Sequence, residues 1–178
     1  MYEDILNFWF QEIDPKMWFT KNSEFDDLIR SRFFDIHTQA KKCELFSWRS
    51  EAKGRLAEII ILDQFSRNLF RDSPEAFASD SLALALAQEA VSLGLDEKLN
   101  NLEKSFLYMP YMHSESLAIH EIAIELYSQE GLENNLDFEK KHKDIIEKFG
   151  RYPHRNQILG RKSSAEEIDF LQQEGSSF

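Results

Sequence analysis

Cysteine, glycine and proline are all scarce in this sequence. A single cysteine, Cys43, stands among 178 residues, which excludes an intrachain disulfide and is typical of a protein held in a reducing compartment. Six glycines and four prolines, with no low-complexity stretch, leave no obvious linker between domains. We therefore expect one domain over residues 1–178.

Positive charge and long apolar runs are also in short supply. The chain has 21 lysines and arginines against 32 aspartates and glutamates, and its formal net charge is −11. Because nucleic acids and anionic membranes bind cationic surfaces, we expect neither as the main partner. Glu58 and Glu89 interrupt the most apolar windows well before the ~18 uncharged residues that a membrane span needs, and the N-terminus is acidic where a secretory signal would be basic. We therefore expect a soluble, cytoplasmic protein.

The standard signatures of nucleotide, hydrolase and metal sites are missing. The sequence has no glycine-rich phosphate loop, no Gly-x-Ser-x-Gly elbow and no Cys-x-x-Cys pair. A zinc protease helix would need a histidine four residues after His120, but that residue is Ile124. His113, Glu115 and His120 could still ligate a metal, although a helix beginning near Ser114 explains the first two better. We predict no metal and no cofactor.

What the sequence does contain is apolar residues spaced three and four apart, which predicts an all-α fold. Short loops between the expected helices favour a bundle or an α-solenoid stack, although no tetratricopeptide repeat recurs in register. Pro110 is expected to kink or stop the helix that precedes it. Seven or eight helices are expected, at about 2–13, 23–42, 50–69, 82–93, 102–109, 114–130 and 138–149, with a last helix that is capped by Ser163 or Ser164 and contains Ile168, Phe170 and Leu171.

Two segments, 62–71 (LDQFSRNLFR) and 149–161, interleave arginines with large apolar side chains. In the first segment the apolar stripe of a core helix is followed by five polar residues, which fill an arc of about 140° on one face at 100° per residue. This face could bind an anion or a carboxamide, or it could be a buried network that joins helices, with Asp63 and Arg67 as one pair. The candidate binding residues of this segment are Asp63, Gln64, Arg67, Asn68 and Arg71.

In the second segment, Gly150 and Pro153 break a helix and are followed by a helix start at Ser163 or Ser164. Free backbone N–H groups at such a junction, together with arginines, could bind a phosphate or a carboxylate. The carboxylate of Phe178 or acidic residues of the first helices could be the anions instead. We expect the junction to be the better candidate for ligand contact, with candidates Arg151, His154, Arg155, Asn156 and Arg161, joined by His113 and Glu115.

The ordered motifs resemble the bacterial family called domain of unknown function 924, over essentially the whole chain. They are residues 7–10, 18–19, 62–71, 76–80, 106–110, 113–115, 149–156 (FGRYPHRN), 159–161 and 175–178. The resemblance implies a tetratricopeptide-like right-handed α-α superhelix and no particular activity. Three residues depart from the family pattern: Cys43 replaces a usual glycine, Ser66 a usual proline and His120 a common glutamine, and the last weakens His120 further as a metal ligand.

Three functional hypotheses follow. A helical scaffold could bind an acidic peptide, a partner protein or a small anionic ligand in a groove lined by Arg67, Arg71, His113, Arg151, His154 and Arg155. Alternatively, an enzyme could act on a small anionic substrate, with His113 or His154 as acid or base and Asp63 or Glu115 as the orienting carboxylate. The polar residues could also be purely structural. No oligomeric state is predicted.

Overall fold

The computed structural model describes residues 1–176, which form helices and no strand. The prediction of an all-α fold is confirmed, whereas the right-handed superhelix and the single domain stay predictions. The α-helices are α1 (Tyr2–Asn7), α2 (Ser23–Lys41), α3 (Ala52–Ile60), α4 (Ser66–Leu69), α5 (Asp80–Ser92), α6 (Asn101–Met112), α7 (Leu117–Tyr127), α8 (Glu133–Phe149) and α9 (Ala165–Leu171). Short 3₁₀ or π turns are η1 (Phe8–Glu12), η2 (Pro15–Phe19), η3 (Phe46–Ser50), η4 (Ile61–Phe65), η5 (Pro74–Ala76), η6 (Asp96–Lys98) and η7 (Pro153–Arg155).

Local side-chain chemistry sets the helix ends. The Ser164 hydroxyl accepts from the Glu167 N–H at 3.1 Å, and the Glu167 carboxylate accepts from the Ser164 N–H at 2.7 Å, which forms a capping box at Ser164, one of the two positions expected for this helix start. Helix α8 ends at Phe149, and the residue after it, Gly150, has a left-handed φ of 67°.

Of the two effects expected of Pro110, a kink or a stop, the stop does not occur, because α6 continues to Met112. A proline removes only one intrahelical N–H, and in the last turn few bonds depend on it. The next turn still closes, since the N–H of His113 donates to the carbonyl of Met109 at 2.9 Å.

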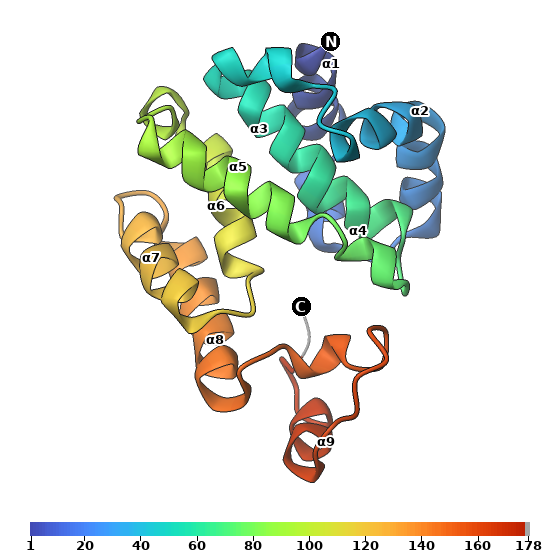
Figure 1. Ribbon diagram of the computed structural model, residues 1–178, viewed down its shortest axis with the longest axis vertical. Coiled ribbons are helices and arrows are strands. Elements are labelled where there is room, and N and C mark those ends of the chain that lie inside the picture. Colours follow the sequence, from blue (N-terminus) through green and yellow to red (C-terminus); the bar gives the residue numbers. More distant parts are fainter. Residues whose placement is uncertain (177–178) are drawn as a thin grey trace.

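The run α3–η4–α4 is the central element of the fold. Figure 1 shows α3 passing through the middle of the molecule toward α4, between α2 and α5. Helix α3 packs against α1, α5 and α6, α6 packs against α7, and α7 packs against α8. Leu56 and Leu62 are fully buried, as the predicted core position of this helix requires. The polar segment that begins at Asp63 therefore follows a fully buried stretch of the chain.

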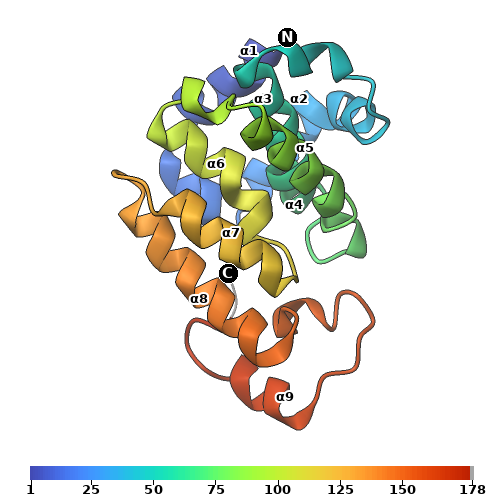
Figure 2. The same cartoon turned by 60° about the vertical axis from the view of Figure 1, so that its left-hand side comes forward.

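The apolar side chains form two cores of unequal size. The larger core extends from Ile5 to Leu132 and includes Trp9 and Trp48, and Trp18 packs against it. The smaller core consists of Ile145, Ile146 and Tyr152, with aromatic rings packed around them. Figures 1 and 2 place α9 and the loops beside it at the end of the molecule opposite α1. We call residues 150–176 the C-terminal segment.

Within residues 1–176, every helix is too short or too polar to cross a lipid bilayer.

Candidate functional site

A π turn interrupts the central helix where its polar residues begin. Segment η4 (Ile61–Phe65) joins α3 to α4 without a break in the chain direction. Side chains of the following turn bind its carbonyl groups: the Ser66 hydroxyl donates to the Leu62 carbonyl at 2.6 Å, and Arg67 donates to the Asp63 carbonyl at 2.8 Å. Such π turns occur frequently at functional sites. Here the turn changes the helix face on which Asp63 and the residues after it lie.

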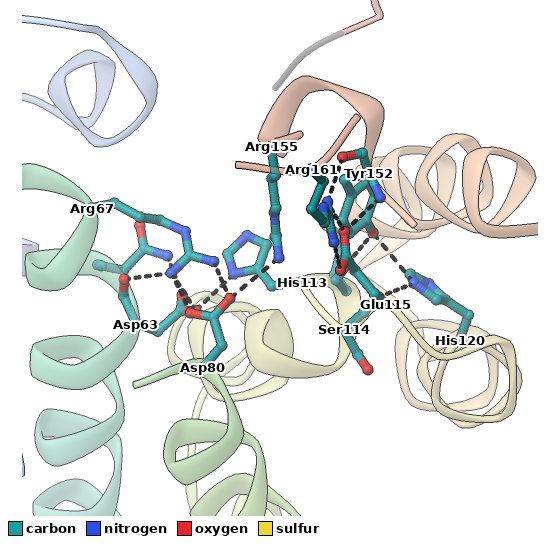
Figure 3. Close-up of polar contacts among 12 residues, drawn as sticks. Asp63, Arg67, Asp80, His113, Ser114, Glu115, His120, Tyr152, Arg155 and Arg161 are labelled. Atoms are coloured by element: carbon teal, nitrogen blue, oxygen red, sulfur yellow. Dashed lines mark hydrogen bonds and ion pairs between the residues drawn. The ribbon is translucent and has the colours of Figure 1, made fainter. Parts of the chain in front are cut away.

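Asp63 is a buried carboxylate whose oxygens are fully engaged. Its side chain is 1% exposed. One oxygen lies 2.7 Å from Nδ1 of His113 and 3.1 Å from the Arg67 guanidinium, and the other accepts from Gln64 at 2.6 Å. Burial disfavours the charge, but Arg67 and His113 hold the pKa of Asp63 below its ordinary value. Asp63 is therefore ionised and orients the imidazole of His113 (Figure 3).

His113 carries its proton on Nδ1 and leaves Nε2 as an acceptor. Burial and then the charge of Arg67 lower the pKa of His113, so the ring is neutral at pH 7. A neutral imidazole has one N–H, and the ionised Asp63 beside Nδ1 can only accept, so the N–H is there. Among residues 1–176 no group is hydrogen-bonded to Nε2.

Asp80, at the start of α5, joins two arginines from distant segments. Arg67 forms a two-pronged pair with it at 3.0 and 3.1 Å, and Nη1 of Arg155 lies 3.4 Å from the same carboxylate. Sequence reasoning missed Asp80 because the motif at 76–80 was interpreted only as a helix start. The presence of an acid in a motif shared with the family was the available signal.

Arg155 has the least complete hydrogen bonding of the arginines in this region. It is 7% exposed, and its guanidinium lies 4.7 Å from the ring centre of Phe77 and 4.6 Å from that of Tyr152. The 3.4 Å contact with Asp80 is its one hydrogen bond to the described residues, and its buried Nε has no partner there. Burial, followed by the nearby charge of Arg67, lowers the pKa of Arg155. A cation in this position needs further acceptors.

A partly open pocket of about 320 Å³ lies beside Arg155 and His113. Its walls come from η5 and the start of α5, from the end of α6, and from η7 and the residues after it. We call it the Arg155 pocket. Its lining residues are Pro74, Phe77, Ala78, Asp80, Ser81, Leu84, Pro110, His113, Ser114, Glu115, Arg155 and Leu159.

Glu115 fastens the C-terminal segment to the rest of the site. Arg161 donates to both of its oxygens at 2.6 and 2.8 Å, and the Tyr152 N–H donates to one of them at 2.7 Å. Burial disfavours the charge of Glu115, but Arg161 and the Tyr152 N–H hold its pKa below the ordinary value. Figure 3 shows this cluster separate from the Asp63–His113 pair. Glu115 therefore positions the pocket wall and does not orient a histidine.

A family model described as a bacterial protein of unknown function, DUF924, matches residues 5–175. The chain belongs to this family. The solved structure of a protein of unknown function, ATU0120 from Agrobacterium tumefaciens, has 38% sequence identity and a TM-score of 0.91, and the match covers 96% of each chain. A search of curated proteins found no match.

The other predicted site residues of this DUF924 protein have protein partners away from the pocket. Asn68 and Arg71 bind Asp26 of α2, at 2.8 Å and at 2.6 and 2.7 Å. The single 140° polar face was therefore a wrong prediction. The π turn shifts the register and α4 ends at Leu69. Arg67 therefore binds Asp80 at the start of α5, and Asp63 binds His113 at the end of α6.

In the junction, most groups also bind to the protein itself. Arg151 pairs with Glu167 at 2.7 and 2.8 Å, and Asn156 donates to the Ser163 hydroxyl at 3.0 Å. The ring of His154 lies 5.5 Å from that of Tyr152 and is not part of the pocket wall. The expected role of the Phe178 carboxylate lies outside the described residues.

The three residues considered as metal ligands bind different protein groups. His120 donates from Nε2 to the Ser114 carbonyl at 2.8 Å, and its Nδ1 lies 2.6 Å from the buried Glu139. Within residues 1–176, no three or more His, Cys, Asp or Glu side chains are arranged to hold a metal. Of the two histidines in the acid–base hypothesis, only His113 lines the pocket, and that hypothesis stays a prediction.

Proposed function

We propose that this protein binds a small carboxylate in the Arg155 pocket, and that Arg155 is the group that holds it. The observation that carries the proposal is a cation that is more than nine-tenths buried and makes one 3.4 Å hydrogen bond to the described residues. A guanidinium has five N–H donors in a planar fork that matches a carboxylate. A bound carboxylate would supply the acceptors that Arg155 lacks.

The neighbouring arginines support a ligand role for Arg155 by contrast. Arg71, Arg151 and Arg161 each hold a carboxylate of the protein through two short bonds. A purely structural arginine is expected to be satisfied in the same way, because buried unpaired donors destabilise a fold. Arg155 departs from this pattern at the wall of a pocket.

The charge and size of the pocket favour a small monoanion. Asp80 and Glu115 line the same space, so a phosphate dianion would meet more repulsion there than a carboxylate would. A volume of about 320 Å³ is at the lower end for small-molecule sites. Acidic peptides and partner proteins generally need a longer contact surface. Apolar walls at Phe77, Leu84 and Leu159 suit a ligand with an apolar body.

Calorimetric titration with apolar carboxylates and with matched phosphate monoesters tests the proposal. Wild-type protein is expected to bind at least one carboxylate more tightly than its phosphate counterpart. Arg155→Met should weaken that binding by about 10- to 100-fold, the range for hydrogen bonds to a charged group. Arg71→Met is the matched control, because it removes a two-pronged ion pair on α2 and should leave binding unchanged.

Equal loss of binding in both variants would indicate a general effect on folding, and undiminished binding in Arg155→Met would refute the proposal. Tighter binding of phosphates would show that the ligand class is wrong.

A further inference from the structure

We infer that the carboxylate bound in the Arg155 pocket also carries a hydrogen-bond donor, a hydroxyl or an ammonium group, and that Nε2 of His113 accepts from it. This inference rests on the proposed function, since it names the kind of ligand that the same pocket takes. The observation behind it is the tautomer of His113, which is set by Asp63.

The direction of the Asp63–His113 hydrogen bond is fixed by the surroundings of Asp63. The Arg67 guanidinium forms an ion pair with the Asp63 carboxylate at 3.1 Å and Gln64 donates to it at 2.6 Å, so it is ionised and has no proton to give. At 2.7 Å, a bare Nδ1 would place a lone pair against a carboxylate lone pair. The proton is therefore on Nδ1, and the lone pair is on Nε2.

A second proton on His113 is disfavoured mainly by burial of the ring. The charge of Arg67 also lowers the pKa of His113, while Asp63 and Asp80 raise it. The ring is therefore a neutral acceptor instead of a further cation. Its side chain is 17% exposed, so a ligand that displaces water from Nε2 must replace the hydrogen bond that water would give.

The two polar groups and the apolar wall together describe the ligand. Arg155 supplies donors, His113 supplies an acceptor, and both side chains line the same pocket. Figure 3 shows the Arg155 guanidinium reaching the Asp80 carboxylate and the His113 imidazole reaching the Asp63 carboxylate. Phe77, Leu84 and Leu159 leave room for an apolar body between α5 and the C-terminal segment. Hydroxy acids and amino acids with apolar side chains have this combination of groups.

A series with one carbon skeleton tests the inference by calorimetry at pH 7.5. The ligands are 3-phenylpropionate, both enantiomers of 3-phenyllactate, 3-hydroxy-3-phenylpropionate and phenylalanine. At least one donor-bearing ligand should bind about 3- to 10-fold more tightly than 3-phenylpropionate, the range for one neutral hydrogen bond. Comparison of these ligands distinguishes a hydroxyl donor from an ammonium donor, and a donor on one carbon from a donor on the next.

His113→Phe keeps a planar ring but removes the acceptor, and should abolish the preference for the donor while leaving 3-phenylpropionate binding. A preference that survives in His113→Phe would overturn the inference, and it would indicate that Asp80 or Glu115 accepts from the ligand's donor instead. Arg155-dependent binding of 3-phenylpropionate without any donor preference would overturn this inference alone. Failure of every carboxylate to bind wild-type protein would overturn the proposed function as well.

Nitrogen NMR of ¹⁵N-histidine-labelled wild-type protein gives a readout that does not depend on the folding of a variant. The free protein should show His113 with Nδ1 protonated and Nε2 unprotonated, and the preferred donor-bearing ligand should shift the Nε2 signal more than 3-phenylpropionate does. A proton on Nε2 in the free protein would refute the inference.

Discussion

At the scale of single residues, Cys43 has a backbone conformation that residues with a side chain rarely adopt. Its φ is +58°. It follows the end of α2, where its N–H donates to the Ala40 carbonyl at 2.9 Å and the Glu44 N–H donates to the Gln39 carbonyl at 3.0 Å. These two bonds close a Schellman motif, which favours glycine at the left-handed position. The motif gives a physical reason for the glycine that the family resemblance leads us to expect at this position.

Cys43→Gly is expected to raise the free energy of unfolding by about 1 kcal/mol. Removing the Cβ relieves the left-handed strain, and the greater freedom of glycine in the unfolded chain offsets part of the gain. Urea unfolding measures the difference. Cys43→Ala removes the thiol but keeps the Cβ, so it should show no gain; an equal gain in both variants would mean that the thiol, and not the backbone, was responsible.

Residue pairs within one helical turn could be predicted from the sequence, whereas distant partners could not. The Asp63–Arg67 pair follows from a spacing of four, and the structure contains it at 3.1 Å. Asp26 and Asp80 are separated from their arginines by loops and other helices, so no local spacing links them. Tertiary packing decides which of 32 acidic residues meets each arginine.

At the scale of elements, the central helix shows where periodicity stops being a guide. A constant 100° per residue predicts one polar face from Asp63 to Arg71. The π turn η4 breaks that register, and apolar spacing alone does not signal it because both sides of the turn are buried. The helix was predicted, but the direction of its polar residues was not.

Gly54 lies inside α3, where this helix passes close to the backbone of η3. A Cβ at this position would lie 2.2 Å from the carbonyl oxygen of Trp48 in η3. In an ordinary helix, Gly→Ala stabilises by about 1 kcal/mol through helix propensity. Here the backbone of η3 would have to move, so we expect Gly54→Ala to destabilise the protein.

Gly54→Ala is expected to lower the free energy of unfolding by about 2 kcal/mol or more, because overpacking against backbone outweighs helix propensity. Thermal and urea unfolding followed by circular dichroism would measure it. A raised melting temperature would show that η3 moves away from α3 at little cost. Ala52→Gly in the first turn of α3 supplies the control, since it should cost no more than the propensity difference of about 1 kcal/mol plus a small loss of packing.

At the scale of the whole molecule, the all-α class and the family could be predicted from spacing and ordered motifs. The pocket could not, because its walls come from three separate parts of the chain, 74–84, 110–115 and 155–159. The junction at Arg155 was identified as the better ligand candidate, but the role of Asp80 and the division into two cores depend on how the C-terminal segment docks. Docking depends on contacts such as Glu115–Arg161, which join residues far apart in the sequence.

Buried neutral histidines make the molecule sensitive to acid. Burial lowers the pKa of His37 to about 4, that of His142 to about 3 and that of His154 to about 4. Between pH 6.5 and these values the unfolded chain binds protons that the folded chain does not, so stability falls as the pH falls. Glu139 acts in the opposite direction, since burial raises its pKa, but it is one group against four, because the pKa of His113 is lowered as well.

The free energy of unfolding, measured by urea titration followed by circular dichroism, should therefore fall between pH 7 and pH 5, by roughly 2 kcal/mol for each histidine. Carboxylates with lowered pKa values lose their contribution only below their ordinary range near 4, so this window belongs to the histidines. His37→Gln keeps a donor for the Ser66 hydroxyl and should reduce the pH dependence by one histidine's share. A midpoint that is constant from pH 7 to pH 5 would contradict the prediction.

The unequal cores have a consequence for optical measurements. Trp9, Trp18 and Trp48 all belong to the larger core or pack against it, while Tyr152 belongs to the smaller core, against which Phe149 and Phe170 pack. Indole emission therefore reports the larger core alone. A ligand that enters beside Tyr152 would leave the tryptophan emission nearly constant. Partial unfolding of the C-terminal segment would also leave that emission nearly unchanged. A tryptophan introduced in α9, at Phe170, would give the second core a fluorescent signal of its own.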